Sequence, residues 1–563
     1  QIIILIAVIC AIGGSIFTII GPDQLSRLTD YITEHMMTSI DLTVVFEIAI
    51  VLVIFYVSSM ILSLIQGFIM ANVTQKVSQK LRTSISHKIN KLPMSYYNHT
   101  SVGDVLSRMT NDVDTISQAL NQSLGTLLSA IALFVGSLIM MLKTNLIMTI
   151  SGVIAVMIGF IFILLIMRRS QKYFDAQQKH LGQLNGHIEE IYSGHLVVKA
   201  YNGEEKAKQT FQQYNHDLIE SGYKAQCLSG LMMPLMTFIG NFGYVIVCIV
   251  GSLLVMNQAA SLGVIVAFMM YIRFFTQPLS QIAQAMQTLQ SASAAGERVF
   301  EFLDAQEMDN EDDKTQSLSH VRGDVQFQNV QFAYEQGHPI IKNFSSHAYP
   351  GQKIAIVGPT GAGKTTLINL LMRFYELNHG SIYIDGISTQ DVKREDVHSQ
   401  FCMVLQDTWL FEGSIEQNIA YGNEKALKNE IVEAAKQANV HHFIRTLTDG
   451  YDTLINEEGS NVSQGEKQLL TIARALLKNP EVLILDEATS SVDTRLERRL
   501  QGAMDRVMEN RTCFVIAHRL STIINADKIL VLEHGDIVEH GSHEELLNKN
   551  GVYARLYNAQ FAK

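Results

Sequence analysis

Residues 353–371 read KIAIVGPTGAGKTTLINLL, which predicts an apolar strand, a glycine-rich loop and a helix in immediate succession. The loop matches the pattern G-x-x-x-x-G-K-[ST], with Lys364 and Thr365 at its end. Glycines let successive backbone N–H groups surround phosphate oxygens, and the helix N-terminus adds its positive dipole. Lys364 would neutralise phosphate charge, and the Thr365 hydroxyl would be a ligand of Mg²⁺. The predicted nucleotide-binding residues of the loop are Gly358, Pro359, Thr360, Gly361, Ala362, Gly363, Lys364, Thr365 and Thr366.

Two further apolar strands end in residues that suit phosphate chemistry. In EVLILDEATSSVD (481–493), Asp486 follows a buried strand and would join the magnesium shell, and Glu487 would act as the general base. The alternative for this pair is an exposed acidic end of a strand. In CFVIAHRLST (513–522), His518 ends a third strand at the same edge, where it would reach the γ-phosphate and the water. A lone histidine is more often structural.

The composition places much of the chain in a membrane. A length of 563 residues predicts two or more domains. Residues are 47% hydrophobic and only 17% charged, against about 25% charged in an average soluble domain. The net charge of −11 argues against nucleic acid as a partner.

Charge-free runs long enough to cross about 30 Å of hydrocarbon predict six spans. The runs are 1–22, 48–75, 115–142, 144–167, and 225–272, the last holding two crossings joined near 257–261. The run at 1–22 lacks the basic start of a signal peptide, so it is predicted to span. The connecting segments 76–114 and 168–224 have helix-compatible patterns, so we expect helices reaching beyond the membrane rather than solvated connectors.

The charges of the connecting segments predict the orientation. Segments 76–114 and 168–224 are basic, whereas 23–42 is acidic, so the two long segments and both termini are predicted to be cytoplasmic. Arg273 and Glu47 lie near the estimated span ends, where they could face either the lipid interface or a cavity. The predicted domains are a six-span transmembrane domain at 1–296, a polar linker at 297–322 and a nucleotide-binding domain at 323–563.

Together these motifs resemble the ATP-binding cassette (ABC) transporters. VSQGEKQ (462–468) stands where that family has its signature loop, with Ser463 23 residues before Asp486. SVGDVLSRMTNDVD (101–114) and AYNGEEKAKQTF (200–211) are similar to the two coupling segments of the exporters. The resemblance covers the whole chain and implies an exporter half-transporter. Its fold class is an all-α six-helix membrane domain with long cytoplasmic extensions (type IV exporter), followed by an α/β P-loop nucleotide-binding domain.

The resemblance also implies roles for individual residues, with ATP and Mg²⁺ bound. Tyr334 would stack on adenine, and Asp493 would end a loop along the dimer interface. Catalysis would fall to Glu487, His518 and Gln406, with Gln406 and His518 also at the ATP, and the metal would be held by Thr365, Gln406 and Asp486. The signature loop would contact the partner subunit's ATP through Val462, Ser463, Gln464, Gly465 and Glu466.

The signature loop departs from the family's usual L-S-G-G-Q at Val462, Gln464 and Glu466. Gln464 removes a glycine, and Glu466 adds negative charge near an anionic ligand. With Glu487 intact, the chain resembles one half of the bacterial heterodimeric multidrug exporters, whose other half would carry the standard signature and a replaced glutamate. Neutral drift in a homodimer is the alternative.

The predicted function is therefore ATP-driven export of small hydrophobic or amphiphilic compounds across the bacterial cytoplasmic membrane, in contact with membrane lipid. The alternatives are a homodimeric flippase for lipid or lipid-linked substrates and, in a different class, an ATP-gated channel. A gate needs no repeated hydrolysis, so the intact Glu487 favours the pump.

Overall fold

The computed structural model describes residues 2–37, 39–335, 337–405, 408–456, 461–486, 494–517 and 520–560. Four predicted site residues, Gln406, Glu487, Asp493 and His518, lie outside the described residues. The chain divides into two compact units, one formed by 1–90 and 102–305 and the other by 91–101 and 306–563. The predicted domain boundaries at 296/297 and 322/323 stay predictions.

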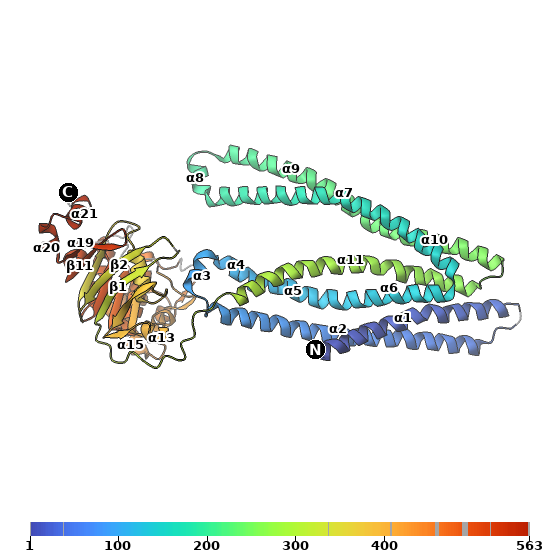
Figure 1. Cartoon of the computed structure of the whole chain (residues 1–563), viewed down its shortest axis with the longest axis horizontal. Coiled ribbons are helices and arrows are strands. Elements are labelled where there is room, and N and C mark those ends of the chain that lie inside the picture. The colour runs from blue at the N-terminus through green and yellow to red at the C-terminus, as the bar shows by residue number, and fades with distance from the viewer. Residues whose placement is uncertain are drawn as a thin grey trace. The chain divides into compact units, whose positions relative to one another are not determined.

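Within the described residues, six helices of the first unit are long and apolar enough to cross a membrane, as predicted. Two of them, Leu42–Ile89 and Leu146–Ser193, have 48 residues each, which is more than a span requires, and are drawn as long helices in Figure 1. The main helices are α1 (Ile2–His35), α2 (Leu42–Ile89), α6 (Leu124–Thr144), α7 (Leu146–Ser193), α9 (Glu204–Gly230), α10 (Met232–Met256) and α11 (Leu262–Asp304). The predicted break near 257–261 is confirmed, because α10 ends at Met256 and α11 begins at Leu262.

The two long connecting segments are helical in the structure. The first continues α2 and returns to α6 through α4 (Val102–Ser107), α5 (Val113–Gln118) and two π-helical turns, η1 (Arg108–Asp112) and η2 (Ala119–Ser123). The second is a hairpin of α7 and α9 joined by the short helix α8 (His195–Ala200), as Figure 1 shows. At its tip Leu196 and Tyr201 are 82% and 83% exposed, so the apolar tip is uncovered within this chain.

A carboxylate fixes the turn between α10 and α11 against α1. Asp30 accepts a hydrogen bond from the Ser261 hydroxyl at 2.8 Å and another from the Gly263 N–H at 2.7 Å. A Cβ at Gly263 would collide with the Asp30 carboxylate and the Ser26 carbonyl, so only glycine permits this approach. Below this turn Phe268, Tyr271 and other apolar side chains of α11 form the buried core of the helices. The start of α11 is therefore held by a specific polar contact.

The second unit contains the predicted α/β nucleotide-binding fold. A six-stranded sheet has the order β12-β11-β3-β10-β9-β6, parallel except for β12, and a four-stranded antiparallel sheet has the order β2-β1-β4-β5. The strands are β1 (Val325–Phe332), β2 (Ile341–Ala348), β3 (Lys353–Val357), β4 (His379–Ile384), β5 (Ile387–Ser388), β6 (Phe401–Val404), β9 (Val482–Asp486), β10 (Thr512–Ile516), β11 (Lys528–Glu533) and β12 (Asp536–Gly541), with a separate pair β7 (Gly413–Ser414) and β8 (Leu454–Ile455).

Helices enclose the parallel strands, which explains why their sequences are continuous apolar runs. Every residue of β10 is buried, as are the four residues Val482–Leu485 of β9. The helices and the short 3₁₀ turn η3 are α3 (Met94–His99), α12 (Lys364–Leu371), α13 (Arg394–Gln400), α14 (Ile415–Ala420), α15 (Lys428–Gln437), α16 (His441–Thr446), η3 (Gly450–Asp452), α17 (Gln464–Lys478), α18 (Thr494–Val507), α19 (Leu520–Ile524), α20 (His543–Asn548) and α21 (Val552–Gln560).

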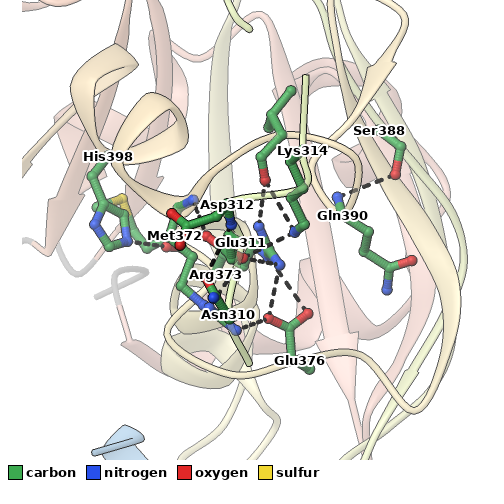
Figure 2. Close-up of polar contacts among 12 residues, drawn as sticks. Asn310, Glu311, Asp312, Lys314, Met372, Arg373, Glu376, Ser388, Gln390 and His398 are labelled. Carbon is green, nitrogen blue, oxygen red and sulfur yellow. Dashed lines mark hydrogen bonds and ion pairs between the residues drawn. The ribbon is translucent and has the colours of Figure 1, made fainter. Parts of the chain in front are cut away.

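The polar segment predicted as a linker is bound to the second unit by ion pairs with little exposure. Glu311 accepts from Arg373 at 2.7 Å, Lys314 at 2.9 Å and Arg394 at 3.0 Å. Figure 2 shows the Glu311 and Arg373 side chains directed at each other, with Glu376 on the other side of the guanidinium. The Arg373 side chain is only 6% exposed and that of Glu311 13%, so this part of the segment is an integral piece of the unit.

Candidate functional site

The phosphate-binding loop lies between β3 and α12, as the motif predicts. Gly363 caps α12 with φ 98°, a left-handed conformation that favours glycine. Gly358 passes so close to the Leu532 carbonyl of β11 that a Cβ would collide with it. Two glycines of the motif are thus required by the backbone path itself, which presents the first N–H groups of α12 at the open end of the loop.

Lys364 is directed into its own loop. Its Nζ donates to the carbonyl oxygens of Gly358 at 2.8 Å and Pro359 at 3.0 Å. Burial lowers the pKa of Lys364, and the nearby Asp486 carboxylate opposes that shift. The ammonium group is therefore positioned where the loop would wrap phosphate oxygens.

Thr365 and Asp486 are suited to hold Mg²⁺ together with phosphate oxygens. The Thr365 side chain is exposed in the first turn of α12, and Asp486 ends β9 beside Lys364. The described residues contain no group of three or more His, Cys, Asp or Glu that could hold a metal by themselves. Mg²⁺ commonly binds through one or two protein oxygens plus the phosphates of its nucleotide.

The strands that precede the predicted residues Glu487 and His518 end at the same edge of the sheet. β9 and β10 pair in parallel with Asp486 opposite Ile516, so the carboxyl ends of the two strands meet at one edge of the sheet. β6 also pairs in parallel with β9, so its carboxyl end at Val404 lies at the same edge. Gln406, Glu487 and His518 themselves lie outside the described residues, so their convergence stays a prediction.

Tyr334, predicted to stack on adenine, is 44% exposed and packs edge-on against Tyr375 and Phe332, with ring centroids 5.0 and 4.9 Å apart. Its hydroxyl donates to Thr366 Oγ1 at 3.3 Å. Sequence reasoning missed Tyr375, whose hydroxyl accepts from Asn98 Nδ2 of α3 at 2.8 Å. The only indication of this contact in the sequence was the polar and aromatic stretch just before the first coupling segment. Through Asn98, segment 91–101 contacts the cluster that carries Tyr334.

The signature loop begins α17, with Ser463 as the N-cap residue. Glu466 Oε2 accepts from the Ser463 hydroxyl at 2.6 Å and from the Ser463 N–H at 3.2 Å. Gln464 Nε2 donates to Thr408 Oγ1 at 3.3 Å. Val462 is buried, and Gly465 lies so close to Leu496 that a Cβ would collide with it. The loop's own carboxylate therefore binds the serine donors that would otherwise be offered to a phosphate.

The C-terminal helix α21 was also missed by sequence reasoning. Its residues Tyr553, Leu556 and Tyr557 line a pocket of about 200 Å³ together with Gly358, Pro359, Thr360 and Lys364. The Tyr553 hydroxyl is 2.6 Å from His543 Nδ1, and burial raises the pKa of Tyr553 to about 12. The signal was the aromatic repeat VYARLY at 552–557.

Comparison with known proteins agrees with this site. Residues 4–279 match the family described as ABC transporter transmembrane region, and residues 341–490 match the family described as ABC transporter. The fatty acid ABC transporter ATP-binding/permease protein of Mycobacterium tuberculosis is 47% identical over 479 residues, 85% of this chain and 76% of the relative. The ATP-dependent lipid A-core flippase of Syntrophus aciditrophicus is 35% identical over 481 residues, 85% of this chain and 80% of the relative.

Among solved structures, a bacterial Atm1-family ABC exporter with ATP bound superposes with a TM-score of 0.77 at 27% identity, covering 100% of this chain and 98% of that chain. Fold and site define an exporter with a transmembrane and an ATP-binding domain in one chain. The chain belongs to the ABC transporter family. It is a multi-pass membrane protein that hydrolyses ATP, with Mg²⁺, to drive transport.

Proposed function

We propose that this chain is one half of a dimeric exporter that moves an amphiphile with a long apolar tail out across a bacterial cytoplasmic membrane. The observation that carries the proposal is the joining of six apolar helices to a complete phosphate loop, with Lys364 directed into it. The basic connecting segments favour a cytoplasmic position for the ATP-binding unit and both termini.

The substrate class follows from the relatives. One is named for fatty acids and another for lipid A-core, so the lipid-type alternative gains support over general multidrug export. Methionines in α10 and α11, such as Met236 and Met269, suit varied apolar compounds, but the same residues also suit helix packing. We therefore place a lipid-like substrate first.

In the proposed ATP cycle each residue keeps the role implied by its motif. Lys364 binds phosphate, and Thr365, Gln406 and Asp486 hold Mg²⁺, which neutralises phosphate charge. Glu487 takes the proton of the attacking water, and His518 contacts the γ-phosphate. Tyr334 stacks on adenine, and Asp493 lies along the dimer interface.

The signature loop supports an unequal pair of ATP sites. Glu466 holds the donors of Ser463, so the loop would bind the partner's γ-phosphate weakly. We propose a heterodimer in which the partner supplies a standard signature to this chain's Glu487. A homodimer with two weak signature loops is the second arrangement.

The test is the steady-state ATPase activity of the chain alone in lipid, beside Glu487→Gln. The heterodimer predicts near-silence, with activity restored by a cassette subunit of unaltered signature and lost again in Glu487→Gln. Strong activity of the chain alone, abolished by Glu487→Gln, would establish the homodimer. If Glu487→Gln leaves the restored activity unchanged, Glu487 is not the base.

A further inference from the structure

Arg273 lies deep within the membrane-spanning part of α11. It is eleven residues after the first residue of α11, Leu262, which corresponds to about 16 Å along a helix. Its guanidinium carbon lies 5.9 Å from the centre of the Tyr244 ring. Tyr244 is midway along α10, a helix of 25 residues without a charge. Both measures place Arg273 near the middle of a hydrocarbon core about 30 Å thick, rather than at a span end.

Arg273 is exposed, and no ion pair joins it to a carboxylate in the part of the chain that the structure describes. Two acidic side chains of α1 have other partners. Asp23 pairs with Arg27 at 3.3 Å, and Asp30 caps the start of α11. A charge at this depth is costly unless it faces water, a ligand or a partner with opposite charge.

Polar side chains continue from Arg273 along the same face. Gln277 follows one turn later on α11, and Thr237, Asn241 and Tyr244 follow one another on α10 at spacings of four and three residues. Thr237, Asn241 and Gln277 are exposed and Tyr244 is half-buried. The spacing of four and three residues puts Thr237, Asn241 and Tyr244 on one face of α10. Lipid-facing surfaces are apolar, so this polar strip indicates a surface that meets water or a polar ligand.

We propose that Arg273 binds the anionic head group of the transported amphiphile, with the Tyr244 ring below the guanidinium and Asn241 and Gln277 beside it. The inference rests on the proposed export of an amphiphile. Cation–π contact leaves the in-plane N–H groups of arginine available, and their fork geometry matches a carboxylate. The apolar tail lies along the surrounding apolar side chains of the helices.

The charge of the site selects a monoanion. Within the described residues α10 carries no cation, the apolar stretches of α6 and α7 carry only Lys143 at the far end of α6, and Arg27 of α1 is paired with Asp23. A single guanidinium balances one negative charge, so a long-chain carboxylate fits and a phosphomonoester, with its second charge, does not.

The test is labelling of the intact transporter, with any cassette subunit that accompanies it, in ATP-free nanodiscs by photoactivatable oleate. Oleate, oleyl alcohol and oleyl phosphate serve as competitors. The variants are Arg273→Gln, Arg273→Lys and the control Lys143→Gln, which removes an exposed cation from α6. ATP-driven export of the same lipids in sealed vesicles is measured separately, because it tests the proposed function and the labelling tests the site.

We expect Arg273→Gln to raise the oleate concentration for half-maximal labelling at least tenfold and to shift competition by oleyl alcohol less than twofold. Arg273→Lys should fall between, because it keeps the charge without the fork, and Lys143→Gln should match the wild type. If Arg273→Gln leaves the affinity for oleate unchanged, or lowers the affinity for oleyl alcohol by the same factor, Arg273 does not bind the anionic head group. Dimer dissociation in that variant, with normal labelling of the remaining dimer, would assign Arg273 to a partner carboxylate instead. Tighter binding of oleyl phosphate than of oleate would contradict the proposed preference for a monoanionic head group.

Discussion

At the scale of single residues, we propose that Glu466 weakens the binding of phosphate by the signature loop. Its carboxylate accepts from the hydroxyl and the N–H of Ser463, so an incoming phosphate meets a negative charge and an occupied donor. We predict that Glu466→Gln, which removes only the charge, raises the ATPase activity of the chain alone several-fold. Steady-state phosphate release in lipid measures the change.

The matched control for this prediction is Glu545→Gln. Glu545 forms the same kind of capping box with Ser542 at the start of α20, away from the signature loop. It should alter stability slightly and leave ATP turnover unchanged. Equal effects of the two substitutions would mean that Glu466 acts only as a helix cap.

Much of the site could be predicted from local sequence, because the phosphate loop and its strand and helix are contiguous in the chain. The pairing of Ser463 with Glu466 was also predictable, since a serine followed three residues later by glutamate is the capping-box pattern. The contact of Asn98 with Tyr375 joins residues 277 apart, and no local pattern announces it. The same holds for the depth of Arg273, which depends on where α11 begins and which ring of α10 lies beneath it.

At the scale of elements, the segment after α11 is stabilised by Glu311. Burial alone would raise the pKa of Glu311, but the Arg394 N–H, Lys314 and the guanidinium groups of Arg373 and Arg394 outweigh it and lower the pKa. We predict that Glu311→Gln destabilises this contact by about 3 kcal/mol, as expected when one partner of a buried ion pair is removed. Hydrogen exchange should increase at the Arg394 amide, which donates to Glu311 at 2.7 Å.

Asp313→Asn is the control, because Asp313 is a neighbouring exposed carboxylate. The pH dependence has a definite sign. The pKa of Glu311 is lowered in the folded state. The stabilisation by its carboxylate is therefore complete at neutral pH and is lost as the pH falls below the ordinary carboxyl range. Protection at Arg394 that is independent of both the substitution and acid pH would show that Glu311 does not hold the segment.

At the scale of the whole molecule, six spans and a hydrolytic cassette in one chain predict a pump. In sealed vesicles with the cassette outside, an oleate analogue should accumulate inside against its gradient with ATP, and Glu487→Gln should abolish accumulation. Equilibration without accumulation would instead indicate the ATP-gated alternative. The matched control is ATP withheld from wild-type vesicles, which separates passive leak from transport.

The number and order of the spans followed from charge-free runs, because hydrocarbon tolerates few charges. The helical continuations beyond the spans were predicted as well. The ion-pair network around Glu311 was not, since acidic residues in a polar segment look alike whether they are solvated or bound. Its partners Arg373 and Arg394 come from the turn after α12 and from the start of α13, far along the chain.

The short turns between the membrane helices have a consequence for the binding of other proteins to this end of the helices. Among the residues that the structure describes, 36–37, 39–41, 145 and 257–261 join the helices at the end of the first unit opposite to α8. A protease or an antibody approaching that end would find almost no backbone to cleave or to grasp. Agents aimed at this transporter from that side would therefore have to enter between the helices rather than attach to a loop.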